Sequence, residues 1–214
     1  GYDEVKDGGT LTYPITEVPA SLNYYHADGA HVDNNNIYGT SLGGPVKIKD
    51  DGTWEVDKNY AESVEIASKD PLVIDVKLNK DAVWEDGSAI DVDDYKAFWK
   101  TQNGSNKKYE VASTKGFEDI EKIESGKDKH EVKVTFKTPN IDWPNYIGAF
   151  LPDEISKSVD KFNKGYTKKV LPSNGPYKAD KLDTKSGVLT MVKNDKWWGQ
   201  EPKLGKVVFK VVSQ

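Results

Sequence analysis

The 214-residue sequence predicts a mixed α/β or α+β fold, and two observations support this class. Short segments in which apolar and polar residues alternate clearly outnumber segments with helical periodicity. Gly and Pro, with 18 and 10 residues, interrupt the chain every few positions and therefore keep each element short. A chain of this length is enough for one large domain or two small ones.

Five segments have the pattern of β-strands. Two of them alternate in polarity, two are runs of β-branched residues that follow Gly187 or Gly205, and the fifth is weaker. In this order they are residues 73–78, 132–137, 188–192, 207–212 and 11–13. Residues 117–123, the polar turn at 125–128 and the strand from residue 132 together predict a β-hairpin.

One helix has a well-marked start at Asp91. Asp91 can cap it, Asp94 is the capping-box partner three residues later, and Ile90 and Tyr95 occupy the hydrophobic-staple positions. The polar residues 103–105 end this helix. Two further helices are expected at residues 145–150, after Pro144, and at residues 155–162.

The composition excludes several classes of protein. The net charge is −5, and all 30 basic residues are Lys, so the Arg forks that read phosphates and guanines are missing and nucleic-acid binding is disfavoured. The absence of Cys removes disulfides, thiolate catalysis and Cys-ligated zinc. Six Trp and eleven Tyr make the chain too aromatic for a disordered protein.

A hydrolase motif occurs at residues 39–43, which match G-x-S-x-G. That motif exposes a nucleophilic Ser only where a strand turns sharply into a helix. Here Asn34-Asn35-Asn36 lie upstream and Gly44-Pro45 follow where the helix must begin. We therefore interpret the segment as a turn or loop.

No metal site is expected from the sequence. His26 and His31 are five residues apart, the wrong spacing for one helix face, and H-E-x-x-H is absent, so both are interpreted as exposed loop residues. His130 is expected to be solvated just before a strand. The acidic run 91–94 lacks the Gly and Glu of a calcium loop. We predict neither a metal nor another cofactor.

The tryptophans leave two functional interpretations open. Large aromatic residues mostly fill cores, but some also line ligand clefts. No residue set resembles catalytic machinery, so we predict a binding protein that is not an enzyme. A carbohydrate-binding or glycoside-degrading module that uses Trp and Tyr platforms is the alternative. The residues concerned are Trp54, Trp84, Trp99, Trp143, Trp197 and Trp198.

Four ordered blocks of the chain resemble the family 5 extracellular solute-binding proteins, the oligopeptide, dipeptide and nickel receptors of ABC importers. The most specific block is residues 78–95, where a strand leads through Trp84-Glu85-Asp86-Gly87 into the helix capped by Asp91. Two departures are Asn79, where the family often has Arg, and Asn23-Tyr24, where it often has Asp-Pro. The other blocks are residues 9–23, Asn174-Gly175-Pro176-Tyr177 and residues 193–204.

The resemblance implies a fold and a domain division. It implies a periplasmic-binding-protein-like first lobe with a mixed sheet and an inserted β-rich subdomain, and with the second lobe absent. Residues 1–38 and 152–214 are expected to form the discontinuous core of this lobe. Residues 39–151 are expected to form the inserted subdomain.

The resemblance also implies ligand-binding residues. Asp28-Gly29-Ala30 fall where the family's first-lobe loop meets the N-terminal part of the ligand, so Asp28 could pair with a peptide ammonium. His31 lies beside this loop, and Tyr109 falls near a position where a Tyr contacts ligand. The alternatives are a solvated turn at 28–30 and a packing role for Tyr109.

The implied function is capture of extended oligopeptides through backbone contacts and delivery to the membrane subunits of an ABC importer. The implied location is the periplasm or the extracellular face of the membrane. Residues 1–9 are polar, so we expect any export signal to have been removed or to lie outside this sequence. Membrane attachment is expected only through an upstream lipid anchor.

Overall fold

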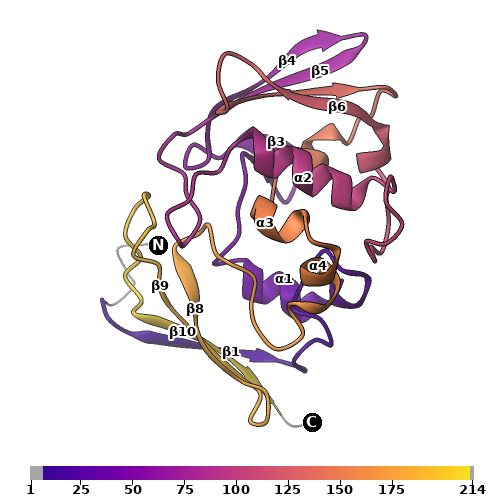
Figure 1. Ribbon diagram of the computed structural model, residues 1–214. Helices are drawn as coiled ribbons and strands as arrows, with labels where there is room; N and C mark the ends of the chain where they lie inside the picture. The colour runs from indigo at the N-terminus through magenta and orange to yellow at the C-terminus, as the bar shows by residue number, and fades with distance from the viewer. Residues whose placement is uncertain (1–6, 213–214) are drawn as a thin grey trace.

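The computed structural model describes residues 7–212 of the chain. Two four-stranded sheets lie at opposite ends of the molecule, and the helices lie between them (Figure 1). Buried side chains from both sheets and from the helices belong to one hydrophobic core. The predicted mixed α+β class is confirmed.

The first sheet joins the two ends of the described chain. Its strands are β1 (Thr10–Ile15), β8 (Tyr177–Asp183), β9 (Val188–Lys193) and β10 (Lys206–Val211), in the order β1-β10-β9-β8. β1 runs parallel to β10, and the other neighbours are antiparallel. Three of these strands were predicted from the sequence, and β8 was not.

The second sheet is antiparallel throughout. It contains β4 (Ala61–Lys69), β5 (Leu72–Leu78), β6 (Ile120–Ser125) and β7 (Glu131–Phe136), in the order β4-β5-β7-β6. The predicted hairpin is confirmed as β6 and β7, although its first residues, Phe117–Asp119, form a 3-10 turn. One face of the sheet is apolar and buried against the helices, and the other carries charged side chains.

A small antiparallel sheet of β2 (Val46–Ile48) and β3 (Trp54–Val56) lies between α1 and the second sheet in the sequence. Helix α2 (Val92–Gln102) begins as predicted. The Asp91 carboxylate accepts the Asp93 N–H at 2.9 Å, and the Asp94 carboxylate accepts the Asp91 N–H at 3.0 Å, which completes the capping box. The helix packs against β6 and against the next helix in the chain.

The other two helix predictions need correction. Residues 143–146 form only a 3-10 turn, and 147–150 are not helical, because Gly148 follows closely and disfavours a helix interior. The expected helix at 155–162 is two helices, α3 (Asp153–Ser156) and α4 (Val159–Lys164). Ser158 separates them, since its hydroxyl caps α4 by accepting the Lys161 N–H at 3.1 Å.

Helix α1 (Val32–Tyr38) was missed, and it changes the context of the G-x-S-x-G segment. That segment follows a helix rather than a strand, so it has no nucleophile-elbow geometry. Ser41 is buried, and its Oγ has no hydrogen-bond partner. The interpretation of residues 39–43 as a turn or loop is confirmed.

The tryptophans mainly serve packing. Trp84 and Trp143 are buried, and Trp54, Trp99 and Trp198 are half-buried against the core. Within residues 7–212, no helix is both long enough and apolar enough to span a bilayer.

Candidate functional site

Two segments far apart in sequence meet at one side of the molecule. We call them the 26–31 loop and the 108–111 segment, and they lie side by side at the right of Figure 1. The Ala27 N–H donates to the Glu110 carbonyl at 2.8 Å, and His26 Nε2 lies 2.6 Å from Glu110 Oε2. The structure therefore brings the predicted residues at 28–31 close to Tyr109.

Buried contacts with neighbouring segments fix the backbone of the 26–31 loop. A Cβ on Gly29 would lie 1.8 Å from the Asn23 carbonyl oxygen, so only Gly fits there. The Gly29 carbonyl accepts a hydrogen bond from Asn34 Nδ2 at 2.8 Å, and Asn23 Nδ2 donates to the Phe162 carbonyl at 2.9 Å. All three residues are buried, so the loop has a fixed shape.

The tip of this loop presents polar groups to solvent. The Asp28 side chain is 72% exposed, and Ala30 is also exposed. The Asp28 carboxylate lies 3.9 Å from His26 Nδ1, which already accepts the Asp28 N–H. Glu17 and Glu110 are exposed beside the loop as well. These three carboxylates form an acidic rim that suits a cationic group.

The loop histidines do structural work. His31 Nδ1 accepts the Asp33 N–H at 3.1 Å and so caps α1, while its Nε2 lies 2.9 Å from Glu17 Oε1. His26 caps the 3-10 turn Ala27–Gly29 in the same way and is only 4% exposed. The expectation of exposed loop histidines is therefore wrong for His26, and His31 is only half-exposed. Because Nδ1 of each ring accepts a backbone N–H, this nitrogen carries no hydrogen.

No cluster of three His, Cys, Asp or Glu side chains suited to a metal occurs in the described part of the chain.

His130 precedes β7 as expected, but it is half-buried. Its Nε2 is buried without a hydrogen-bond partner, so His130 is less solvated than predicted.

Asp33 fixes the end of β1 next to the loop. Its Oδ2 accepts hydrogen bonds from the Thr16 N–H, the Thr16 hydroxyl and the Glu17 N–H at 2.6–3.1 Å. Burial alone would raise the pKa of Asp33, but these hydrogen bonds and the nearby His31 lower it below the ordinary value. The anchored carboxylate therefore holds the strand end that carries Glu17.

Tyr109 is anchored by its hydroxyl. The hydroxyl donates to the Ser156 carbonyl at 2.6 Å, and the ring packs edge-on against Phe162 with centroids 5.4 Å apart. Asn163 holds the adjacent backbone by accepting the Glu110 N–H and donating to the Lys108 carbonyl. Tyr109 nonetheless lines two surface cavities of about 420 and 260 Å³. Neither cavity is lined by a residue of the 26–31 loop.

Sequence reasoning missed His26, Glu17 and Glu110 as parts of this surface. His26 precedes the 3-10 turn, but His is not among the preferred capping residues, so this local signal is weak. Glu110 lies 84 residues from His26 along the chain, and only the fold brings the two together.

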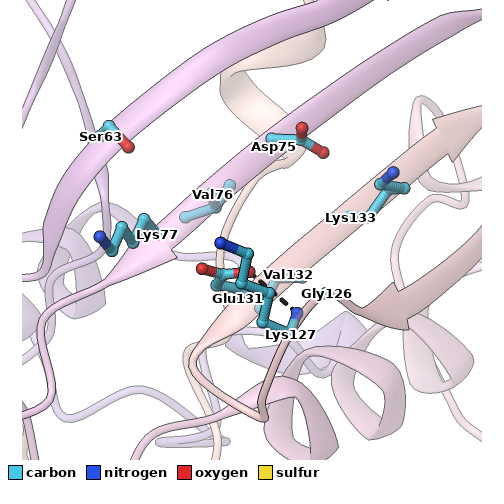
Figure 2. Close-up of a pocket in the computed structure, with 9 residues that line it drawn as sticks. All are labelled: Ser63, Asp75, Val76, Lys77, Gly126, Lys127, Glu131, Val132 and Lys133. Carbon is cyan, nitrogen blue, oxygen red and sulfur yellow. Dashed lines mark hydrogen bonds between the residues drawn. The ribbon is translucent and has the colours of Figure 1, made fainter.

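A separate pocket of about 330 Å³ lies on the outer face of the second sheet (Figure 2). Charged side chains of β5 and β7 and the β6–β7 turn surround it. No sequence motif indicated this site.

Trp197, Trp198 and Tyr60 form an aromatic cluster, but they do not make a flat platform for a sugar ring. The Trp197 and Trp198 rings are tilted by 49° with centroids 4.6 Å apart, and Tyr60 packs edge-on against Trp198. Both indole N–H groups donate to backbone carbonyls, those of Gln200 and Asn59. This cluster therefore closes a loop over the core.

Comparisons with known proteins agree with one another. The family model of bacterial extracellular solute-binding proteins, family 5 (middle region), matches residues 55–214. The oligopeptide-binding protein OppA of Mycobacterium tuberculosis is 30% identical over 211 residues, which are 97% of this chain and 36% of that protein.

Two solved structures of binding proteins match this chain in fold. The periplasmic EDTA-binding protein EppA matches with a TM-score of 0.87 and 27% identity over 97% of this chain and 40% of EppA. AppA of Bacillus subtilis, solved in complex with a nonapeptide, matches in fold with a TM-score of 0.77 and 21% identity over the same shares. The chain thus spans well under half the length of these proteins.

Proposed function

The chain belongs to the bacterial extracellular solute-binding proteins of family 5, and from this premise we propose that it is part of the substrate-binding component of an ABC-type importer for oligopeptides. The observation that carries the proposal is the 30% identity to an oligopeptide-binding protein over 97% of the chain. As part of a receptor, the chain binds its ligand and catalyses no reaction.

In this proposal the 26–31 loop and Tyr109 form one wall of the ligand cleft. The exposed Asp28, with Glu17 and Glu110 beside it, meets the ammonium group of the peptide. Gly29, Ala30 and His31 set the shape of this wall, and the Tyr109 ring packs against the ligand backbone. Main-chain contacts hold an extended peptide and tolerate varied side chains.

The proposal includes partners, location and domain division. The receptor presents its peptide to the importer's membrane subunits, and a lipid anchor upstream of these residues holds it at the extracellular face of the membrane or in the periplasm. Residues 1–38 and 152–214 form the core of the lobe, and residues 39–151 form the inserted subdomain. Of these, residues 1–6 and 213–214 lie outside the described part of the chain.

Ligand-observed NMR on the 214-residue chain tests the class of ligand. Trialanine should bind with a Kd no tighter than about 1 mM, roughly 4 kcal/mol, because the residues of one wall make only part of the contacts while the cost of immobilising the ligand remains. N-acetyl-trialanine should bind more weakly, since it lacks the ammonium that meets Asp28. Asp28→Asn should reduce that difference, since only Glu17 and Glu110 then remain near the ammonium, and the exposed Asp180→Asn on β8 should preserve it.

Cellotriose serves as the competing ligand in the same experiment. Saturable binding of cellotriose without a response to trialanine would replace the peptide proposal with the carbohydrate alternative. Micromolar binding of trialanine would contradict the one-wall geometry, because it requires a complete site within this chain.

A further inference from the structure

The pocket on the outer face of the second sheet is lined by charged groups that do not neutralise one another. In the strand register, Asp75 of β5 lies opposite Lys133 of β7, and Lys77 lies opposite Glu131. The four groups therefore alternate in sign around the pocket, as Figure 2 shows. Opposite charges at such positions usually pair across the strands.

Neither of these cross-strand pairs closes in this structure. Lys77 pairs instead with Glu62 at 3.3 Å, and Glu131 Oε2 accepts the backbone N–H of Lys127 at 2.9 Å. Within the described residues, the ammonium groups of Lys127 and Lys133 have no ion-pair or hydrogen-bond partner. The pocket therefore has two ammonium groups without an ion-pair partner in this part of the chain, those of Lys127 and Lys133, and the Glu131 carboxylate lies beside them.

Asp75 is a negatively charged group of the pocket that also lacks a partner among the described residues. Its Oδ1 is buried and has no hydrogen-bond partner, which is costly for a carboxylate oxygen. Asp75 as a whole is only half-buried and lines the pocket, so a ligand reaches its carboxylate through the other oxygen. The pocket volume of about 330 Å³ is at the lower end of the range for small-ligand sites. The pocket thus has room for a ligand. Within residues 7–212, its Asp75 carboxylate lacks a hydrogen-bond donor, and its Lys127 and Lys133 ammonium groups lack an anionic partner.

We propose that this pocket is a second binding site, for a small zwitterion whose ammonium group meets the Asp75 carboxylate and whose carboxylate meets Lys127 and Lys133. Free amino acids have this chemistry. The site is separate from the peptide-facing loops, since no lining residue belongs to the 26–31 loop or the 108–111 segment. Exposed charges are partly screened by water and salt, so the affinity is expected to be modest.

Titration of the ¹⁵N-labelled chain with glycine, β-alanine and 4-aminobutyrate tests the proposal. At least one of these should shift the amide signals of residues 75–77, 127 and 131–133 saturably, with a Kd of roughly 1–10 mM. Acetate and methylammonium, each with one of the two charges, should bind about tenfold or more weakly, since each forms only half of the contacts.

Matched variants separate this site from a general charge effect. Asp75→Asn should weaken zwitterion binding about tenfold by removing the charge that meets the ammonium. Glu65→Gln should leave it unchanged, because Glu65 lies beside Asp75 on β4 but does not line the pocket. If Asp75→Asn does not fold, Lys133→Gln should give the same loss.

Three results would overturn the proposal. They are the absence of saturable shifts at these residues with all three zwitterions, equal binding of the singly charged probes, or equal losses in Asp75→Asn and Glu65→Gln. A peptide effect confined to residues 26–31 and 108–111 would leave the function proposed above intact in each case.

Discussion

The shape of the 26–31 loop depends on contacts of individual residues, and Gly29 has the least freedom among them. The Asn23 carbonyl oxygen occupies the space of a side chain at Gly29. Asn34 and Asn23 then fix the backbone on either side through buried amide hydrogen bonds. Because Gly29 between them is fixed against the protein, the neighbouring Asp28 and Ala30 are presented to solvent.

Replacing Gly29 with Ala should therefore destabilise the protein. A Cβ placed 1.8 Å from a backbone oxygen forces the loop to move, at a cost of about 2–3 kcal/mol in unfolding free energy. Gly39→Ala is the matched control, because Gly39 has helical dihedral angles and an added Cβ would be at least 3.4 Å from its neighbours. Urea unfolding of both variants is the measurement, and equal losses would contradict the packing described at Gly29.

The candidate site could be predicted only in part at this scale. Asp28, Gly29, Ala30, His31 and Tyr109 follow from resemblance to a family, and the structure brings the two groups together. Their roles remain predictions. The buried position of His26 and its contact with Glu110 could not be predicted, because they depend on the approach of segments 84 residues apart.

At the scale of elements, helix α2 shows how a local signal and a buried charge combine. Asp94 is 3% exposed, and its carboxylate accepts N–H groups of Asp91 and Asp153 at 3.0 and 2.8 Å. Burial raises the pKa of Asp94 to about 6, although both hydrogen bonds act to lower it. The capping box thus carries a carboxyl group that titrates in mildly acidic solution.

The pH dependence of stability should report this group. Asp94 holds its proton more tightly in the folded state than in the unfolded state, where its pKa is 3.8. The unfolding free energy of the wild type should therefore fall, relative to Asp94→Asn, as the pH rises from about 4 to about 6. The expected difference is about 1–3 kcal/mol, since one pKa unit corresponds to about 1.4 kcal/mol.

Urea unfolding of both proteins across this pH range gives the difference directly. The lost hydrogen bonds of the variant add an offset that does not depend on pH, so only the slope matters. A difference that is flat, or that rises with pH, would contradict a raised pKa at Asp94.

Elements with local signals could be predicted, and those set by tertiary contacts could not. Alternating polarity predicted β5 and β7, and the capping pattern at Asp91 predicted α2. Helix α1 was missed because three consecutive Asn have low helix propensity, and buried contacts of Asn34 and Tyr38 hold it in place. The split between α3 and α4 depends on one hydroxyl cap at Ser158.

At the scale of the whole molecule, the first sheet pairs β1 with β10 across nearly the full length of the described chain. No local pattern predicts that pairing, and the family resemblance implies only that residues 1–38 and 152–214 belong to one subdomain. The second sheet lies at the opposite end (Figure 1). In our proposal, the loops between these ends contact the peptide, and the outer sheet face holds the zwitterion site.

The most direct test of the peptide-binding proposal is paramagnetic relaxation enhancement with trialanine that carries a nitroxide at its C-terminus. The account predicts the strongest signal loss at the amides of residues 28–31 and 109–110, and a clear reduction of that loss when unlabelled trialanine competes. Strongest losses around Trp197 and Trp198, or no loss beyond that caused by the free nitroxide, would contradict it.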